Sequence, residues 1–98
     1  MHFSNFKEFT CTFSGTENHI ALEEGNDVGS YAVDISLEDC KILCDATTGC
    51  NSFSYASDAK RCYPKDGIVT ASSPTRVTGQ WTTYYRVCGM YLNLKKYV

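Results

Sequence analysis

The sequence predicts a small α+β domain held together by disulfide bonds, with one helix and several short antiparallel strands. Six cysteines occur within 98 residues, and an even number of cysteines in so short a chain is typical of a disulfide framework formed in an oxidising compartment. One segment carries the signals of a capped helix, and several others alternate in side-chain type as strands do. We therefore expect the protein to be secreted or otherwise extracellular.

Length and composition favour a single folded domain. The chain has 98 residues, of which 43% are hydrophobic and only two are proline. This composition is that of a globular chain rather than a disordered one, and the length is sufficient for one hydrophobic core but not for two. Because such a core is marginal on its own, we expect the disulfides to supply much of the stability.

The first strand is expected at residues 8–13. Phe9, Cys11 and Phe13 fall on one face of such a strand, and the intervening threonines fall on the other. This alternation predicts a strand with one buried side.

Two shorter strands are expected at residues 20–22 and 31–35, on either side of a solvated acidic turn at residues 23–27. Residues 66–80 are rich in Ser, Thr and Gly and include Pro74. These residue types favour turns and loops, so we expect a long surface loop there.

Residues 36–46 are predicted to form the helix. Ser36 is suited to cap the first turn, and Asp39 stands three residues later, where a carboxylate completes a capping box and is favoured by the helix dipole. Side chains spaced three or four residues apart share one face of a helix. On this face lie Leu37, Cys40, Leu43 and Cys44.

A β-hairpin is predicted for residues 50–65. Residues 50–55 alternate small with aromatic side chains, residues 57–59 favour a turn, and the chain returns through residues 60–63. Folding this hairpin against the helix brings its cysteines close to those of the helix.

The helix and the hairpin reduce the 15 pairings that six cysteines allow. The two helix cysteines are poorly placed to form a disulfide with each other, so each needs a partner from another segment. The later one reaches the start of the hairpin across a short turn, and the earlier one reaches the return strand. The predicted bridges are therefore Cys44–Cys50, Cys40–Cys62 and, for the two cysteines that remain, Cys11–Cys88. In the chain-entropy model they contribute together roughly 10 kcal/mol, comparable to the whole stability of an ordinary domain.

The last strand is expected at residues 81–88. Alternation allows only one face of a regular strand to be buried, so Tyr84 and Tyr85 should not both be inside, and whichever faces outward is a candidate ligand contact. The same alternation leaves open whether Trp81 faces the core or the solvent. Residues 89–98 follow as a tail, which forms either an extra edge strand or a frayed terminus.

Taken together, the helix cysteines, a following Cys-x-Ser-Phe-Ser-Tyr strand at residues 50–55 and a Cys-Tyr-Pro-Lys strand at residues 62–65 resemble the PAN/apple domain family. The resemblance covers residues 9–88. It implies a twisted antiparallel sheet of about five strands that cradles one helix, and it implies the same three bridges, which join the first cysteine to the sixth, the second to the fifth and the third to the fourth.

Catalysis is not expected. A cysteine nucleophile needs a free thiolate beside an imidazole, but the cysteines are expected to be bonded, and the histidines, His2 and His19, precede the helix. The adjacent carboxylates at residues 23–24 and 38–39 lie in a turn and in the first turn of the helix, where solvation or capping explains them.

We expect no metal, no cofactor and no nucleic-acid partner. The cysteine gaps are longer than in zinc knuckles, and the acidic turn lacks the spacing of a calcium loop. A net charge of −2 does not favour nucleic acid. No segment is apolar for long enough to cross a bilayer, and none resembles a signal peptide. If the domain is extracellular, as the cysteines indicate, its targeting signal has been removed or lies elsewhere in a larger protein. We expect this domain to be excised from such a larger multidomain protein.

One mixed surface is a candidate ligand site. Lys60, Arg61 and Lys65 cluster around Tyr63, and Asp58 lies at the turn of the hairpin. Charged and aromatic side chains in such a group are suited to sugar hydroxyls, sulfates or a protein partner. The alternative is a solvated hairpin tip on which Tyr63 packs against the helix.

The resemblance implies adhesion or recognition. Domains of this family dock proteins in blood-clotting zymogens, bind heparin in the N-domain of a growth factor, and bind galactose-type sugars in microneme adhesins and lectins of apicomplexan parasites. We expect a non-enzymatic extracellular module that binds glycan within an adhesive, lectin-like protein. The alternatives are protein docking in a larger secreted protein, or a secreted inhibitor.

Overall fold

The computed structural model describes residues 2–22 and 25–97, with side chains for residues 11–22 and 25–89. Within these residues the chain forms six strands and one helix. They are β1 (His2–Gly15), β2 (His19–Ala21), α1 (Leu37–Ala46), β3 (Ser52–Ala56), β4 (Arg61–Lys65), β5 (Thr75–Val77) and β6 (Trp81–Tyr97). The predicted α+β class is confirmed.

The strands form two antiparallel sheets rather than a single one of about five strands. The larger sheet has the order β1-β6-β3-β4, and β2 pairs with β5 in the smaller sheet. Strand β2 agrees with the strand predicted at residues 20–22. Strand β5 lies within the predicted loop. The sequence does not predict this strand because all three of its residues are exposed, so no alternation of buried and exposed positions marks it.

The prediction of a strand at residues 31–35 is wrong. This segment makes one isolated antiparallel bridge, between Ala32 and Cys62. Asp34 has a φ of 54°, a left-handed conformation that an extended strand does not contain. The segment therefore runs beside β4 without continuing as a strand.

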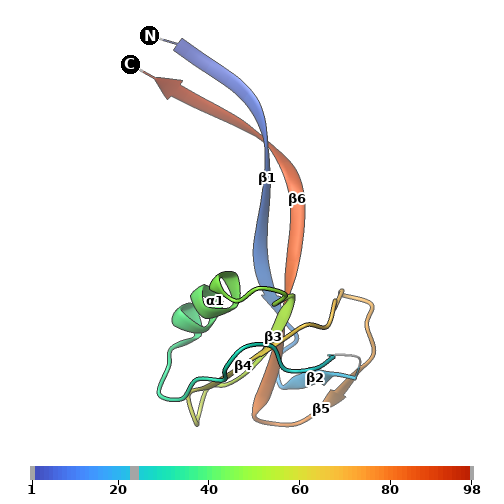
Figure 1. The fold of residues 1–98 in the computed structure, drawn as a ribbon. Helices are drawn as coiled ribbons and strands as arrows, with labels where there is room; N and C mark the ends of the chain where they lie inside the picture. Colours follow the sequence, from blue (N-terminus) through green and yellow to red (C-terminus); the bar gives the residue numbers. More distant parts are fainter. Residues whose placement is uncertain (1, 23–24, 98) are drawn as a thin grey trace.

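Strands β1 and β6 pair from His2 with Tyr97 to Gly15 with Tyr84. Figure 1 shows them leaving the other elements together as a long ribbon, with both ends of the chain at its far end. Only residues 81–85 of β6 also pair with β3. The division of the chain into a domain of residues 9–88 and a tail stays a prediction.

The buried face that was expected for the first strand is found only near the C-terminal end of β1. Phe13 packs on the core, whereas Cys11 is exposed. The reason is that Cys11 lies opposite Cys88, beyond residues 81–85 of β6, where β3 adds a further strand to the sheet. Phe9 lies outside the residues whose side chains are described.

Helix α1 begins as the sequence predicts. The Ser36 side chain accepts a hydrogen bond from the Asp39 amide at 3.1 Å, which satisfies one of the free amides of the first turn. Cys40 and Cys44 are fully buried, and the helix contacts β3 and β4. The predicted phase of the helix is therefore confirmed.

Replacing the cap tests how much this helix start contributes. Ser36→Ala is expected to lower the free energy of unfolding by about 1 kcal/mol, because the Asp39 amide loses its acceptor. The measurement is urea unfolding of the oxidised protein. Ser36→Asp keeps an acceptor and should unfold like wild type, and equal stability of the Ala and Asp variants would contradict the role of the cap.

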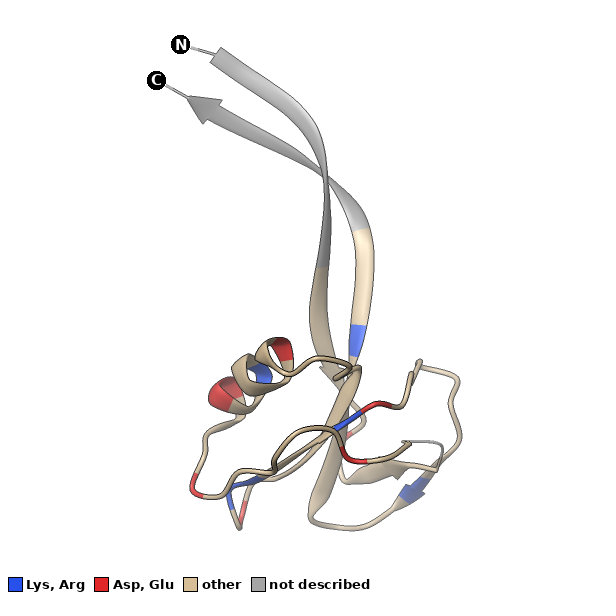
Figure 2. Cartoon of the chain, in the orientation of Figure 1, with Lys and Arg blue, Asp and Glu red and all other residues tan. Residues whose placement is uncertain are grey.

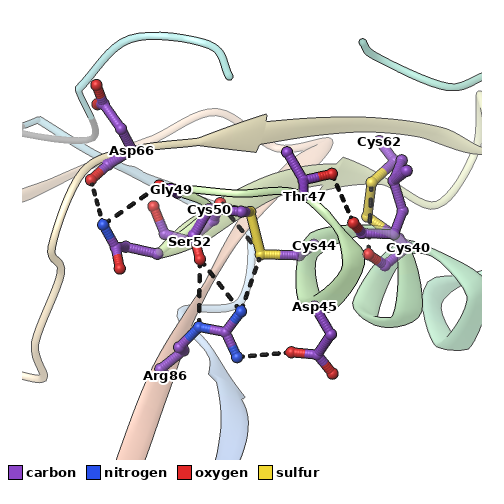
Figure 3. The surroundings of a disulfide bond; sticks show 12 residues. Cys40, Cys44, Asp45, Thr47, Gly49, Cys50, Ser52, Cys62, Asp66 and Arg86 are labelled. Carbon is purple, nitrogen blue, oxygen red and sulfur yellow. Dashed lines mark hydrogen bonds and ion pairs between the residues drawn. A yellow bond between two sulfur atoms is a disulfide. The ribbon is translucent and has the colours of Figure 1, made fainter. Parts of the chain in front are cut away.

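All three predicted disulfides are present: Cys11–Cys88, Cys40–Cys62 and Cys44–Cys50. The two inner bridges lie in the core between helix and sheet, and they join α1 to β4 and to the segment before β3 (Figure 3). The outer bridge joins directly opposed residues of β1 and β6 at an exposed position.

Arg86 of β6 forms hydrogen bonds to the helix and to the segment before β3 (Figure 3). Its guanidinium donates to Asp45 of the helix at 2.7 Å and to the Cys50 carbonyl at 3.1 and 3.3 Å. The same group lies 4.6 Å from the centre of the Phe13 ring, a cation–π contact. This one side chain of β6 thus contacts β1, the segment before β3 and the helix.

Candidate functional site

Where β6 pairs with β3, the larger sheet is covered on both faces. Because Cys62 of β4 bonds to the helix, the residues that flank it point to the opposite face, away from α1. Arg61, Tyr63 and Lys65 therefore share that outer face of β4. On the same face, Tyr85 packs under Ala21 and Val69.

A row of three aromatic rings crosses this outer face. The Tyr63 ring lies between Tyr31, whose centroid is 5.2 Å away in a stacked arrangement, and Trp81, whose centroid is 5.3 Å away and tilted. Tyr31 is 61% exposed, and the other two rings are half-buried. The alternative in which Tyr63 packs on the helix is therefore wrong.

A pocket of about 220 Å³, here the first pocket, opens on this face. Its walls come from β2, the segment before the helix, and strands β3, β4 and β6. They are Ile20, Asp27, Ser54, Tyr63, Lys65 and Trp81. The sheet register explains the grouping, because Ser54 is opposite Tyr63 and the chain enters β6 at Trp81, opposite Ala56.

Lys65 and Asp27 form an ion pair at the edge of the first pocket. An isolated bridge between the same two residues holds their backbones together. The Lys65 side chain is 16% exposed, and that of Asp27 is 59% exposed. The pair therefore presents an oriented donor and an exposed acceptor next to the aromatic rings.

A second pocket, of about 250 Å³, lies next to the first. The two pockets share the side chains of Asp27 and Tyr63. The second is completed by Val28, Gly29, Ser30, Tyr31 and Pro64.

The other predicted contacts lie elsewhere. Asp58 and Lys60 are exposed at the hairpin tip, where Lys60 has a φ of 50°. They do not line either pocket. Arg61 is exposed at the start of β4, on the face of Tyr63. Figure 2 shows positive and negative residues interspersed along the coloured chain rather than gathered into one basic surface.

The expectation that Tyr84 or Tyr85 faces solvent is not met. Tyr85 is 9% exposed. Tyr84 is half-buried on the helix side, where it stacks on Phe53 at 5.1 Å. Burial raises the pKa of the Tyr84 phenol, and Lys41 opposes this effect in part. Both tyrosines are covered because the sheet has the helix on one face and β2 on the other.

Sequence reasoning did not identify Ile20, Asp27 or Ser54, which line the first pocket, or Tyr31, which lines the second. Two isolated bridges, Asp27 with Lys65 and Ala32 with Cys62, align the segment before the helix beside β4. Neither bridge has a signal in the sequence.

Among the described residues, no group of three or more His, Cys, Asp or Glu side chains is placed to hold a metal ion. No helix in residues 2–22 and 25–97 is long and apolar enough to cross a membrane.

Comparisons with known proteins agree with this architecture. Residues 23–74, more than half of the chain, match the family model of the PAN domain. Micronemal protein 4 of Toxoplasma gondii is 42% identical over 40 residues, which cover 41% of this chain and 7% of that protein. The chain thus corresponds to a small part of that relative's length. No solved structure gives a significant match. The chain belongs to the PAN domain family.

Proposed function

We propose that this domain is an extracellular recognition module that binds carbohydrate, and that the first pocket holds one sugar ring. The observation that carries the proposal is the combination of Tyr63 and Trp81 with the Lys65–Asp27 pair in one pocket. Aromatic faces cover the apolar side of a sugar ring, and the charged pair donates to and accepts from its hydroxyls.

The size of the pocket supports a small ligand. Pockets for drug-sized ligands typically measure roughly 300–1,000 Å³, and the first pocket measures about 220 Å³. A single ring fits this volume better than an extended chain does. The pocket also combines apolar walls with a few convergent polar groups, as small-molecule sites generally do.

Membership of the family supports a binding role. PAN domains are typically non-catalytic modules, and proteins or glycans are their usual ligands. The disulfides and the similarity to a micronemal protein are consistent with passage through the secretory pathway. We infer that the domain recognises glycans outside the cell, as part of a larger adhesive protein.

Binding to galactosylated and sulfated glycans on an array, followed by calorimetry on the strongest binder, tests the proposal. Trp81→Ala is expected to weaken binding by about tenfold, equivalent to about 1.4 kcal/mol. Lys65→Met should weaken it similarly, because the oriented donor is lost. The hairpin-tip variant Lys60→Ala/Arg61→Ala serves as the control and should bind a neutral glycan like wild type.

The dependence of affinity on salt concentration distinguishes a neutral sugar ligand from a sulfated one. Affinity for a neutral sugar should change little between low and high salt, whereas binding of a sulfated glycan to exposed cations should weaken as screening increases. If wild type binds no glycan, or if Trp81→Ala binds every glycan like wild type, the proposal is wrong.

Protein docking is the second candidate, and one observation favours it. Tyr31 and Val33, which are 61% and 51% exposed, flank the bridge that joins Ala32 to β4. Arg61 is exposed on the same strand, and aromatic and arginine side chains are enriched at protein interfaces.

A further inference from the structure

We propose that the ligand spans two sugar rings, and that the second ring occupies the second pocket, on the far side of Tyr63 from Trp81. This inference rests on the proposed function and names the length of ligand that the site accepts. It makes Tyr31 and the segment before the helix part of the binding site.

The two pockets adjoin, because Tyr63 and Asp27 line both of them. Their volumes, about 220 and 250 Å³, are similar, and each is below the usual size of a site for a drug-sized ligand. Two adjoining spaces of one-ring size match two linked rings better than they match one larger compact ligand.

The second pocket offers the same two kinds of contact as the first. Tyr31, Val28 and Pro64 provide apolar surface, and Ser30 provides a hydroxyl. More than half of the Tyr31 surface is exposed, although one side of its ring stacks on Tyr63. A sugar ring in this pocket would cover apolar surface that solvent now contacts.

Asp27 is placed to serve both rings. One of its carboxylate oxygens pairs with Lys65. An ionised carboxylate has two oxygens and about four sites that accept hydrogen bonds, and the Asp27 side chain is 59% exposed. The pair with Lys65 therefore leaves acceptor capacity for hydroxyls on either side of the junction.

Gly29 lets the backbone that lines the second pocket lie against the end of the helix. Its φ is 64°, and a Cβ there would lie 2.8 Å from the Thr47 methyl group. Any other residue would be strained and would displace Thr47, which donates to the Leu43 carbonyl at the end of the helix. The glycine thus lets the wall of the second pocket pass close to the helix without a side chain.

The test compares one terminal sugar presented as its methyl glycoside and as a disaccharide. The probes are methyl β-galactoside, two disaccharides that carry the same terminal galactose in 1→3 and 1→4 linkage, and the 6-sulfated forms of all three. Affinities are measured by calorimetry for wild type, Tyr31→Ala, Tyr31→Phe and Trp81→Ala. Ile68→Ala, at a side chain that is 79% exposed and lines neither pocket, is the matched control.

We expect at least one disaccharide to bind wild type about tenfold more tightly than its methyl glycoside, equivalent to about 1.4 kcal/mol. Tyr31→Ala should abolish this gain, so that the disaccharide and the methyl glycoside bind this variant with similar affinity. Tyr31→Phe should keep most of the gain because the ring remains. Trp81→Ala should weaken all probes alike.

The outcomes separate this inference from the proposed function. Equal affinities for the methyl glycoside and both disaccharides, in a protein that does bind the glycoside, overturn the second ring site alone. A gain that survives Tyr31→Ala also overturns it, because the second ring then lies elsewhere. Failure of wild type to bind any of these probes counts against the proposed function itself.

Discussion

Full reduction of the three disulfides is expected to unfold the domain. In the chain-entropy model these bridges contribute together roughly 10 kcal/mol, while the total stability of a domain is typically about 5–15 kcal/mol. The inner bridges Cys40–Cys62 and Cys44–Cys50 are also part of the core itself, with exposures of 0 to 5%. Their reduction therefore removes a constraint on the unfolded chain, and it also disturbs the core, because two thiols need more space than one disulfide.

The three bridges should not open together. A disulfide opens when a thiolate reaches one of its sulfur atoms, and Cys11 and Cys88 are exposed while the inner four cysteines are buried. We expect a mild reductant to release the thiols of Cys11 and Cys88 first. Alkylation of samples taken at intervals, followed by mass spectrometry of the peptides, measures this order.

Circular dichroism of the same samples reports the fold. The protein treated with alkylating agent but no reductant is the control, and it should keep six bonded cysteines and an unchanged spectrum. A protein with six alkylated cysteines and the native spectrum would contradict the dependence on disulfides. Early alkylation of the buried cysteines would contradict the predicted order.

The elements that could be predicted from the sequence are those whose signals are local. Ser36 and Asp39 mark the start of the helix, and the phase that follows points Cys40 and Cys44 at the sheet. The alternation of small and aromatic residues in β3 identifies the hairpin. Once the helix phase and the hairpin are placed, the cysteine pairing follows from distance alone.

The remaining elements depend on contacts between distant segments. Strand β5 is exposed along its whole length, and it exists because it pairs with β2. Tyr85 is buried because β2 and Val69 cover the face opposite the helix. A single sequence carries no signal that a second layer lies there, so alternation along β6 predicts one buried and one exposed face.

The residues of the candidate site also fall into those that local sequence signals indicate and those that depend on contacts between distant segments. Tyr63 and Lys65 could be proposed from their grouping in the hairpin, and both line the first pocket. Their partners Asp27 and Tyr31 come from a segment that was expected to form a turn and a strand. Its actual course depends on a left-handed residue at Asp34 and on isolated bridges to β4. The composition of the two pockets was therefore only partly predictable.

Phe53→Ala is expected to cost about 3–5 kcal/mol, the usual range for removing a buried aromatic ring from a core. Phe53 has no exposed surface. Its ring meets Phe13 edge-on at 5.1 Å and stacks on Tyr84 at 5.1 Å, so the truncation leaves a cavity among the central strands. The bridges around the cavity restrict how far the helix and sheet can collapse to fill it.

Urea unfolding of the oxidised protein, followed by tryptophan fluorescence, measures this loss. Ile68→Ala is a suitable control because Ile68 is 79% exposed, and surface truncations of this kind usually change stability by less than about 0.5 kcal/mol. A loss below about 1 kcal/mol for Phe53→Ala would mean that the disulfides hold the fold almost without the aromatic core. A loss in the expected range would mean that the core is needed even when all three bridges are intact, because the bridges limit the unfolded chain but do not replace the packing that Phe53 provides.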